Sequence, residues 1–151
     1  MSGLVGQVGS RSGVINTTEL EYEEGTFTIS HSATSGSATV NSSYDTGYYV
    51  RVGNLVHIQA NINLSGGSGS GQLQITLPFV NGTSADESQV SAGAIATYSV
   101  NYVSGSYGVW EISGDGATFV SLMTAGDDTT WGNFYFASGD YYLFSIQYRT
   151  Q

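Results

Sequence analysis

The chain has 151 residues, no cysteine, and twelve acidic side chains against three basic ones, for a net charge of −9. One domain is the natural expectation at this length, and the missing cysteines exclude disulfides and thiolate metal sites. The negative charge argues against nucleic acid and acidic membrane surfaces as partners, and no segment approaches the ~20 apolar residues of a membrane span.

The first 21 residues differ from the rest of the chain. Their glycines stand at positions 3, 6, 9 and 13, with neither strand alternation nor large aromatic side chains between them. This spacing lacks the G-x-G-x-x-G pattern and the Walker lysine of phosphate-binding loops. A secretory leader is not indicated, because the basic residue Arg11 follows the apolar residues instead of preceding them. We predict an extended N-terminal docking arm over 1–21 and a single β-sandwich domain over 22–151.

Alternating apolar and polar residues predict short β-strands along the remainder of the chain. The expected strands cover residues 26–30, 37–40, 47–52, 55–64, 72–77, 94–102, 107–113, 117–123, 133–137 and 140–149. Glycine-containing turn sequences separate them, and no amphipathic helical run appears. Short strands at such spacing are typical of a sandwich or a barrel. We predict an all-β fold, an antiparallel β-sandwich of jelly-roll-like type.

The stretch LVHIQANINL (55–64) shows strict alternation between a polar and an apolar face. Its polar residues are His57, Gln59, Asn61 and Asn63. We expect the GGSGSG segment (66–71) to form a flexible turn and 72–77 to pair with 55–64 as a hairpin. The residues predicted to point inward from 55–64, 72–77 and 140–149 are Val56, Ile58, Ala60, Ile62, Leu64, Leu73, Ile75, Leu77, Tyr142, Phe144, Ile146 and Tyr148.

No pattern in the sequence predicts a catalytic residue or a cofactor. Glu23 and Glu24 are neighbouring carboxylates, and paired carboxylates can cleave sugars. However, no apolar pocket is evident that would separate their pKa values, so we interpret them as part of a solvated linker. His31 and His57 show no metal-binding spacing, and the G-x-S-x-G motif of a serine nucleophile is absent.

Calcium is an alternative for three aspartates in glycine-containing turns, Asp115, Asp127 and Asp128. Loop oxygens are the ligands that Ca²⁺ takes. The pattern is not that of an EF-hand, and aspartate is also common in turns for conformational reasons. The sequence therefore leaves open whether any loop binds calcium.

Aromatic side chains are abundant, with eleven tyrosines, two tryptophans and six phenylalanines. Tyr107, Trp110 and Trp131 lie beside predicted turns, where their rings could form a sugar-stacking surface. The alternative is packing in the core or at a subunit interface, because aromatic residues with few charges also fit an obligate oligomer.

Part of the sequence resembles a recurrent pattern in tailed-phage virion proteins. The resemblance lies in YEEGTFTIS (22–30) and in the stretch 44–79, and it extends only loosely beyond them. The first motif has Phe27 where tryptophan is common in that group. The matching residues are Tyr22, Glu23, Glu24, Gly25, Thr26, Gly47, Tyr49, Gly53, Asn54, Val56, Leu77, Pro78 and Phe79.

The resemblance implies a trimeric jelly-roll sandwich of the kind found in phage fibres, tail proteins and capsid decorations, which are typically not enzymes. Our first hypothesis is a capsid decoration (cement or head-fibre) protein on the capsid surface, made in the host cytoplasm. Its arm would dock on the major capsid protein, with Arg11 pairing with a capsid carboxylate. The apolar docking residues would be Leu4, Val5, Val8, Val14 and Ile15.

The alternative is a tail-associated receptor-binding or adhesin module. Its arm would join another virion protein, and loops near Tyr107 and Trp131 would contact a host-surface glycan. A third hypothesis, a carbohydrate-active enzyme, lacks a convincing carboxylate pair in the sequence.

Overall fold

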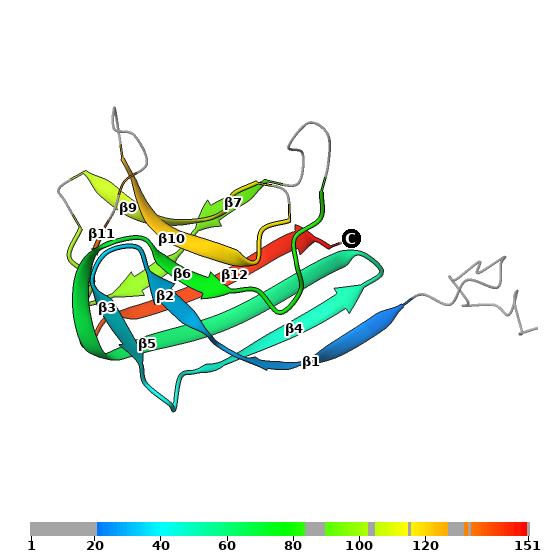
Figure 1. Cartoon of the computed structure of the whole chain (residues 1–151), viewed down its shortest axis with the longest axis horizontal. Coiled ribbons are helices and arrows are strands. Elements are labelled where there is room, and N and C mark those ends of the chain that lie inside the picture. The colour runs from blue at the N-terminus through cyan, green and yellow to red at the C-terminus, as the bar shows by residue number, and fades with distance from the viewer. Residues whose placement is uncertain are drawn as a thin grey trace, which may run out of the picture.

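The computed structural model describes residues 21–83, 90–102, 105–114, 116–126, 132 and 134–150, with the backbone alone for Phe134. The regular structure within these ranges consists of β-strands, arranged as two antiparallel sheets that pack face to face (Figure 1). The prediction of an all-β sandwich is therefore confirmed.

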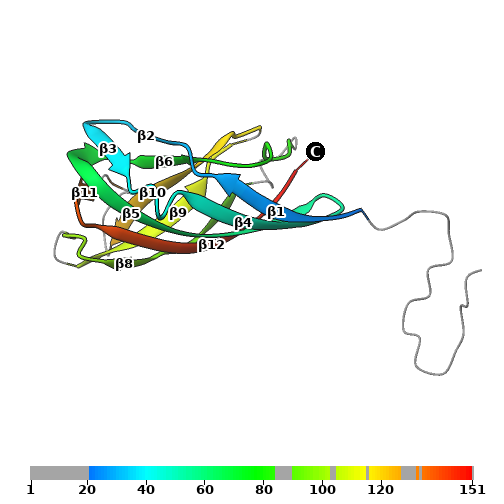
Figure 2. The same ribbon diagram turned by 90° about the horizontal axis from the view of Figure 1, so that it is seen from below.

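The first sheet is built around strand β5, with the order β1-β4-β5-β12-β8 and two further strands, β3 and β11, on the second half of β5. Figure 2 shows β1, β4, β5, β12 and β8 in one layer. The strands are β1 (Tyr22–Thr28), β3 (Ser37–Val40), β4 (Thr46–Val52), β5 (Leu55–Gly71), β8 (Ala96–Tyr98), β11 (Phe134–Ala137) and β12 (Tyr141–Arg149).

The second sheet has the order β2-β6-β10-β9-β7. Its strands are β2 (His31–Ala33), β6 (Leu73–Thr76), β7 (Ser91–Ala94), β9 (Ser106–Ile112) and β10 (Phe119–Gly126). Short stretches connect the two sheets, as between β2 and β3, so that consecutive strands of the chain often belong to different layers (Figure 1).

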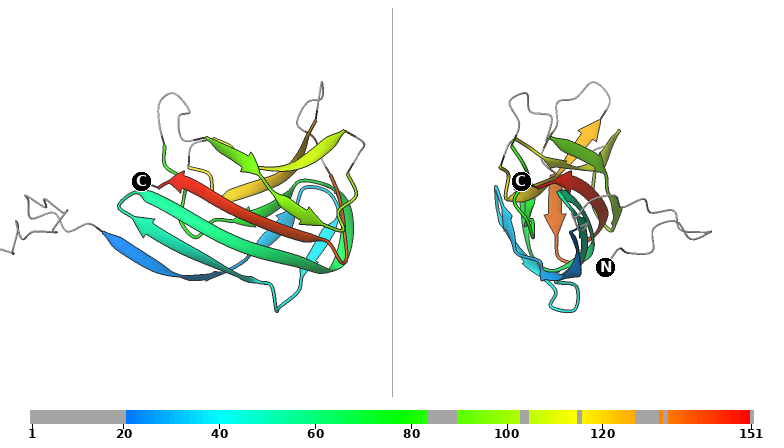
Figure 3. Two further views of the ribbon diagram at one scale, coloured as in Figure 1. Left: turned by 180° about the vertical axis from the view of Figure 1, so that it is seen from behind. Right: turned by 90° about the vertical axis from the view of Figure 1, so that its right-hand side faces the viewer.

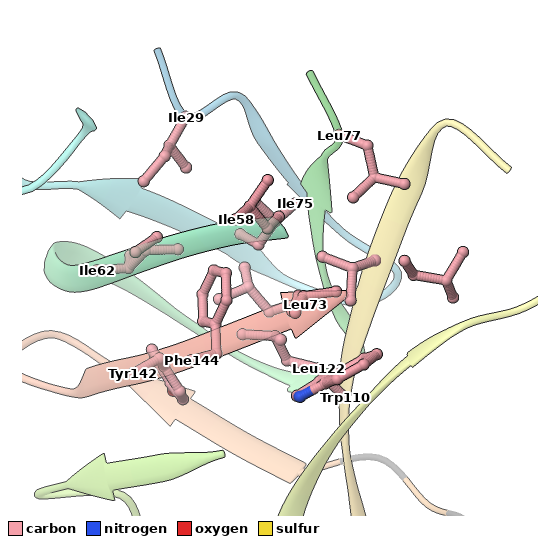
Figure 4. Packing of buried hydrophobic residues seen from close by; sticks show 14 of the residues in the cluster. Ile29, Ile58, Ile62, Leu73, Ile75, Leu77, Trp110, Leu122, Tyr142 and Phe144 are labelled. Atoms are coloured by element: carbon pink, nitrogen blue, oxygen red, sulfur yellow. The ribbon is translucent and has the colours of Figure 1, made fainter. Parts of the chain in front are cut away.

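The core lies between the sheets and consists of the apolar faces of alternating strands. All the residues predicted to point inward from 55–64, 72–77 and 140–149 are buried, and none is more than 7% exposed. Figure 4 shows side chains of the first sheet, such as Phe144, against those of the second, such as Leu122. The period of two therefore predicted the buried face of three strands correctly.

The predicted hairpin between 55–64 and 72–77 is wrong. The segment 66–71 is not a turn but the second half of β5, which pairs with β3 on one side and β11 on the other. Strand β6 pairs with β2 and β10 in the second sheet instead. Glycine here lets the strand bend and lets neighbouring backbones approach closely, and Figure 1 shows β5 curling towards β6 at this end.

The predicted strand 94–102 covers the last residue of β7, the crossing at Ile95 and β8, and its residues 99–102 are not in a strand. Ala94 of β7 pairs with Val109 in the second sheet, and Ala96 of β8 pairs with Leu143 in the first. The chain therefore crosses between the layers at Ile95, and Figure 3 shows this segment beside β12. Continuous alternation in the sequence hid the crossing, because both strands keep the same period.

Asp140 fastens the turn between β11 and β12 to β5. Its buried carboxylate accepts hydrogen bonds from the Ala137 N–H at 2.8 Å and from the Tyr142 hydroxyl at 3.1 Å. Its backbone carbonyl accepts hydrogen bonds from the Leu64 N–H at 2.9 Å and from Asn63 Nδ2 at 3.3 Å. This acidic residue therefore has a structural role.

The bend in β5 yields a stability prediction. The register with β3 shifts between Thr39 and Val40, and Gly67 next to this β-bulge has a φ of +87°. We expect Gly67→Ala to lower the free energy of unfolding by about 2–5 kcal/mol, because a Cβ there is strained and would lie about 2.9 Å from Ala38 Cα. Urea denaturation measures the difference.

Gly66→Ala is the matched control for this substitution. A Cβ at position 66 would lie 3.6 Å from the nearest atoms of Thr39, which is an ordinary contact. We expect a change within about 1 kcal/mol for this variant. Equal losses in the two variants would contradict a strained, positive-φ conformation at Gly67.

A second prediction concerns Tyr148, which joins β12 to Phe79. Its buried hydroxyl donates to the Phe79 carbonyl at 3.0 Å and accepts from the Phe79 N–H at 3.3 Å. Burial raises the pKa of Tyr148 to about 12. Above pH ~10 the unfolded chain releases the phenol proton while the folded chain keeps it. The free energy of unfolding therefore falls between pH ~10 and about 12.

We expect Tyr148→Phe to be about 1 kcal/mol less stable at pH 7, because the hydrogen bonds are lost. Its stability should also fall less steeply than that of the wild type between pH 9 and pH 11.5. Urea denaturation across this pH range is the measurement, and Tyr135→Phe, at a 62% exposed position, is the control. An unchanged pH dependence in Tyr148→Phe would show that this residue does not cause the loss of stability at alkaline pH.

Candidate functional site

The outer face of the first sheet carries a regular array of uncharged side chains. Because β12 and the part of β5 up to residue 64 bury their even-numbered residues, the odd-numbered residues there point to the other face of the sheet. The register places Asn61 opposite Leu143, and Gln59 opposite Ser145. Tyr48 of β4 lies on the other side of Gln59. Amides, a hydroxyl, an aliphatic chain and an aromatic ring therefore share one surface.

A hollow of about 930 Å³ lies over this part of the sheet. Its floor comes from β5 and β12, and one wall comes from the segment in which the chain crosses from β7 to β8. We call it the first hollow. Its lining residues are Ser43, Tyr44, Thr46, Tyr48, Gln59, Ala60, Asn61, Ala94, Ile95, Ala96, Leu143, Phe144 and Ser145.

Among the described residues, the lining of the first hollow contains no acidic or basic side chain. Tyr48 is 65% exposed, so its ring offers an apolar face beside the hydrogen-bonding amides of Gln59 and Asn61. Ring faces with polar tips bind partners that are apolar on one side and hydroxylated at the edge. Sugars have this combination of surfaces.

Three tyrosines gather beside the first hollow. The rings of Tyr44 and Tyr141 meet edge to face at 5.6 Å, and those of Tyr98 and Tyr141 at 6.0 Å. A hydrogen bond with Tyr44 raises the pKa of Tyr141.

Two of the aromatic residues chosen from the sequence, Tyr107 and Trp110, point to opposite faces of the second sheet. Tyr107, which is 58% exposed, is in β9 and points away from the core on the second sheet. Trp110 is a correction, because it is 6% exposed and packs in the core against Gly93, which leaves little of its ring for sugar stacking. Trp131 lies outside the described residues.

Other predicted sites also lie outside the described residues. These are the aspartates considered for calcium and the arm residues considered for docking, namely Asp115, Asp127, Asp128, Leu4, Val5, Val8, Arg11, Val14 and Ile15. Among the residues that are described, no group of three histidine or acidic side chains could hold a metal ion. The same ranges contain no helix long and apolar enough to cross a bilayer.

Glu23 and Glu24 do not form an acid–base pair. They belong to strand β1 and not to a linker, as the sequence had suggested, so they point to opposite faces of the sheet. Glu23 accepts a hydrogen bond from the Tyr49 hydroxyl at 2.7 Å and lies 3.9 Å from Arg51. Glu24 accepts a hydrogen bond from the Tyr22 hydroxyl. The strand itself therefore separates the two carboxylates.

The two predicted histidine positions have different surroundings. His31 Nε2 lies 2.9 Å from the Ala38 carbonyl, which ties β2 to β3. His57 lies on the outer face of β5, where its Nε2 is 3.5 Å from Ser145 Oγ. The sequence correctly placed His57 on a polar face, but it gave no sign that this face is hollowed.

Sequence reasoning missed the first hollow because its residues come from β4, β5, β12 and the crossing at Ile95. The signal that was present is the polar side of 55–64, which has amides instead of charges. Two exposed residues of neighbouring strands, Tyr48 and Leu143, complete the surface. Only the strand order brings these segments together.

No protein-family model matches the chain, and no curated protein matches it. Among solved structures, the chain is similar to part of the crystal structure of the Dettilon tailspike protein, with a TM-score of 0.66 and 20% sequence identity. The similar region covers 85% of this chain and 23% of the tailspike chain. At this identity the likeness shows a common fold.

Proposed function

We propose that the protein is a bacteriophage virion component, a tail-associated receptor-binding module that holds an uncharged host-surface glycan in the first hollow. The observation that carries the proposal is the lining of this hollow, in which the exposed ring of Tyr48 adjoins the amides of Gln59 and Asn61 without any charged group. The likeness of the fold to part of a tailspike, a protein named for the phage tail, supports it.

The chemistry of the hollow favours a neutral sugar over an acidic one. The ring of Tyr48 can stack on the apolar face of a pyranose. The side-chain amides of Gln59 and Asn61 each offer a donor and an acceptor to sugar hydroxyls. An anionic sugar would lose water without gaining a cationic partner among the lining residues, and it would approach a chain with a net charge of −9.

The likeness to a tailspike favours this hypothesis over capsid decoration, which the sequence analysis had put first. Capsid docking rests on the arm, and the described residues contain no feature that indicates a capsid partner. The proposal also treats the module as a binding protein without catalytic activity, since no carboxylate lines the first hollow. Virion location is common to both hypotheses.

The first test compares Tyr48→Ala with Tyr107→Ala on a panel of purified bacterial surface polysaccharides. Half of the panel has uncharged repeating units, and half carries uronic or sialic acids. We expect the wild type to bind a neutral polysaccharide without shortening it. Tyr48→Ala should bind this polysaccharide about tenfold or more weakly than the wild type. Tyr107→Ala should bind it as tightly as the wild type. Surface plasmon resonance measures the affinities.

The outcomes of this test are distinct. Loss in Tyr107→Ala with retention in Tyr48→Ala would move the site to the second sheet, as the sequence analysis suggested. Retention of acidic polysaccharides alone would contradict a neutral ligand. A Tyr48→Ala variant with altered oligomeric state and unchanged retention would assign the first hollow to a subunit interface.

We further propose that the protein is a homotrimer attached to another virion protein by residues 1–21. Apolar side chains support self-association, because the register places the exposed Tyr22 and Leu55 and the half-buried Val52 in one row on the outer face of the first sheet. This row lies at the end of the sheet where the chain enters β1 (Figure 1). The arm would therefore leave the domain next to the subunit contact.

The arm is tested by deleting residues 2–15. We expect the shortened protein to stay folded and trimeric, as measured by circular dichroism and by light scattering after size-exclusion chromatography. It should no longer bind to virions that lack the wild-type protein, and immunogold labelling of wild-type virions should mark the tail. Binding of the shortened protein at wild-type occupancy would contradict the docking role of the arm, and labelling of the head would support capsid decoration.

A further inference from the structure

A second hollow, of about 580 Å³, is lined by residues of β5 and β12 in the first sheet and of β7 and β9 in the second. Its floor includes His57 of β5 and Gln147 of β12, which lie opposite each other in the register. We call it the second hollow. Its lining residues are His57, Val90, Ser91, Ala92, Trp110, Ser145 and Gln147.

The two hollows are neighbours on the sheet and share one lining residue. Ser145 lines both of them. The floor runs through three successive outward pairs, from Asn61–Leu143 through Gln59–Ser145 to His57–Gln147. Along β5 this floor spans four residue steps, or about 13 Å at ~3.3 Å per residue.

One stretch of chain borders both hollows on the same side of the floor. Residues 94–96 border the first hollow and residues 90–92 border the second, so one short stretch of chain flanks both. This stretch is β7 together with the crossing at Ile95. A ligand that follows the floor from Asn61 to His57 therefore stays against the same wall.

The second hollow has the same uncharged hydrogen-bonding character and adds an imidazole. Gln147 supplies an amide, and Ser91 and Ser145 supply hydroxyls. His57 Nε2 lies 3.5 Å from Ser145 Oγ, at the point where the hollows meet. Its Nδ1 is buried without a hydrogen-bond partner among the described residues. Polar groups that are left without a partner in a buried position are costly and call for an explanation.

We propose that the two hollows form one binding groove, and that its ligand is an oligosaccharide segment of more than one sugar rather than a single terminal sugar. The inference rests on the proposed function, because it assumes that the first hollow binds glycan. The first hollow holds one part of the segment against Tyr48, and the second holds the next part against Gln147. Ser145 contacts the ligand between them.

The experiment uses two saccharides that differ in length. The shorter is a single sugar and the longer contains three sugars, and both are prepared by partial acid hydrolysis of the polysaccharide that the wild type retains. Isothermal titration calorimetry on the full chain measures both affinities. We expect the longer oligosaccharide to bind at least about tenfold more tightly, since it adds several hydrogen bonds.

Two amide variants distinguish the hollows. Gln147→Ala should weaken binding of the longer oligosaccharide about three- to tenfold and leave the shorter one unchanged. Asn61→Ala should weaken both. Gln74→Ala, which removes an amide from the second sheet, is the matched control and should change neither. Circular dichroism and urea denaturation confirm that each variant is folded.

The results separate the inference from the proposed function. Equal affinities for the two saccharides would overturn the continuous groove, and so would equal weakening of their binding by Gln147→Ala. Binding that depends on Tyr48 would still support the proposed function in either case. If the wild type binds no polysaccharide, the proposed function is overturned, and the groove with it. Tighter binding of the longer saccharide that is weakened by Gln147→Ala, with binding of the shorter one unchanged, supports the inference.

Discussion

The pairing of β5 is the constraint on which the rest of the structure depends. Its first half is flanked by β4 and β12, and its second half by β3 and β11. A slip of one residue would turn Ile62 outward and Asn61 inward. Each buried aliphatic side chain contributes roughly 1.5–3 kcal/mol, so the apolar face of β5 holds this register strongly. The floor of the proposed groove is thereby fixed by the core beneath it.

Strand β12 is held at both ends, which fixes the other half of the floor. Asp140 ties its beginning to β5, and the Tyr148 hydroxyl ties its end to Phe79. The outward residues Leu143, Ser145 and Gln147 lie between these two attachments. Side chains carried on such a strand keep their spacing better than side chains on loops. A groove of this kind is suited to a ligand with repeated, regularly spaced hydroxyl groups.

The sequence predicted the sandwich and the buried faces of its clearest strands because burial has a period of two, which a single chain displays directly. It failed where the answer depends on strand partners. The segment 66–71 has the composition of a turn, yet β3 and β11 supply hydrogen bonds that make it a strand. The first hollow was hidden for the same reason, since Tyr48, Asn61 and Ile95 become neighbours only through the sheet order. Trp110 looked like a surface residue because turns flank its strand.

The contacts of Arg51 show how the first hollow can stay uncharged. Arg51 lies 3.9 Å from both Glu21 and Glu23, donates to the Gly53 carbonyl at 2.9 Å, and stacks 5.3 Å from the Phe79 ring centre. Such contacts hold the guanidinium at the β1 end, away from Tyr48 and the first hollow. The net negative charge of the chain then repels acidic polymers over most of its surface. Selectivity for a neutral glycan would thus come as much from exclusion of anions as from contacts in the groove.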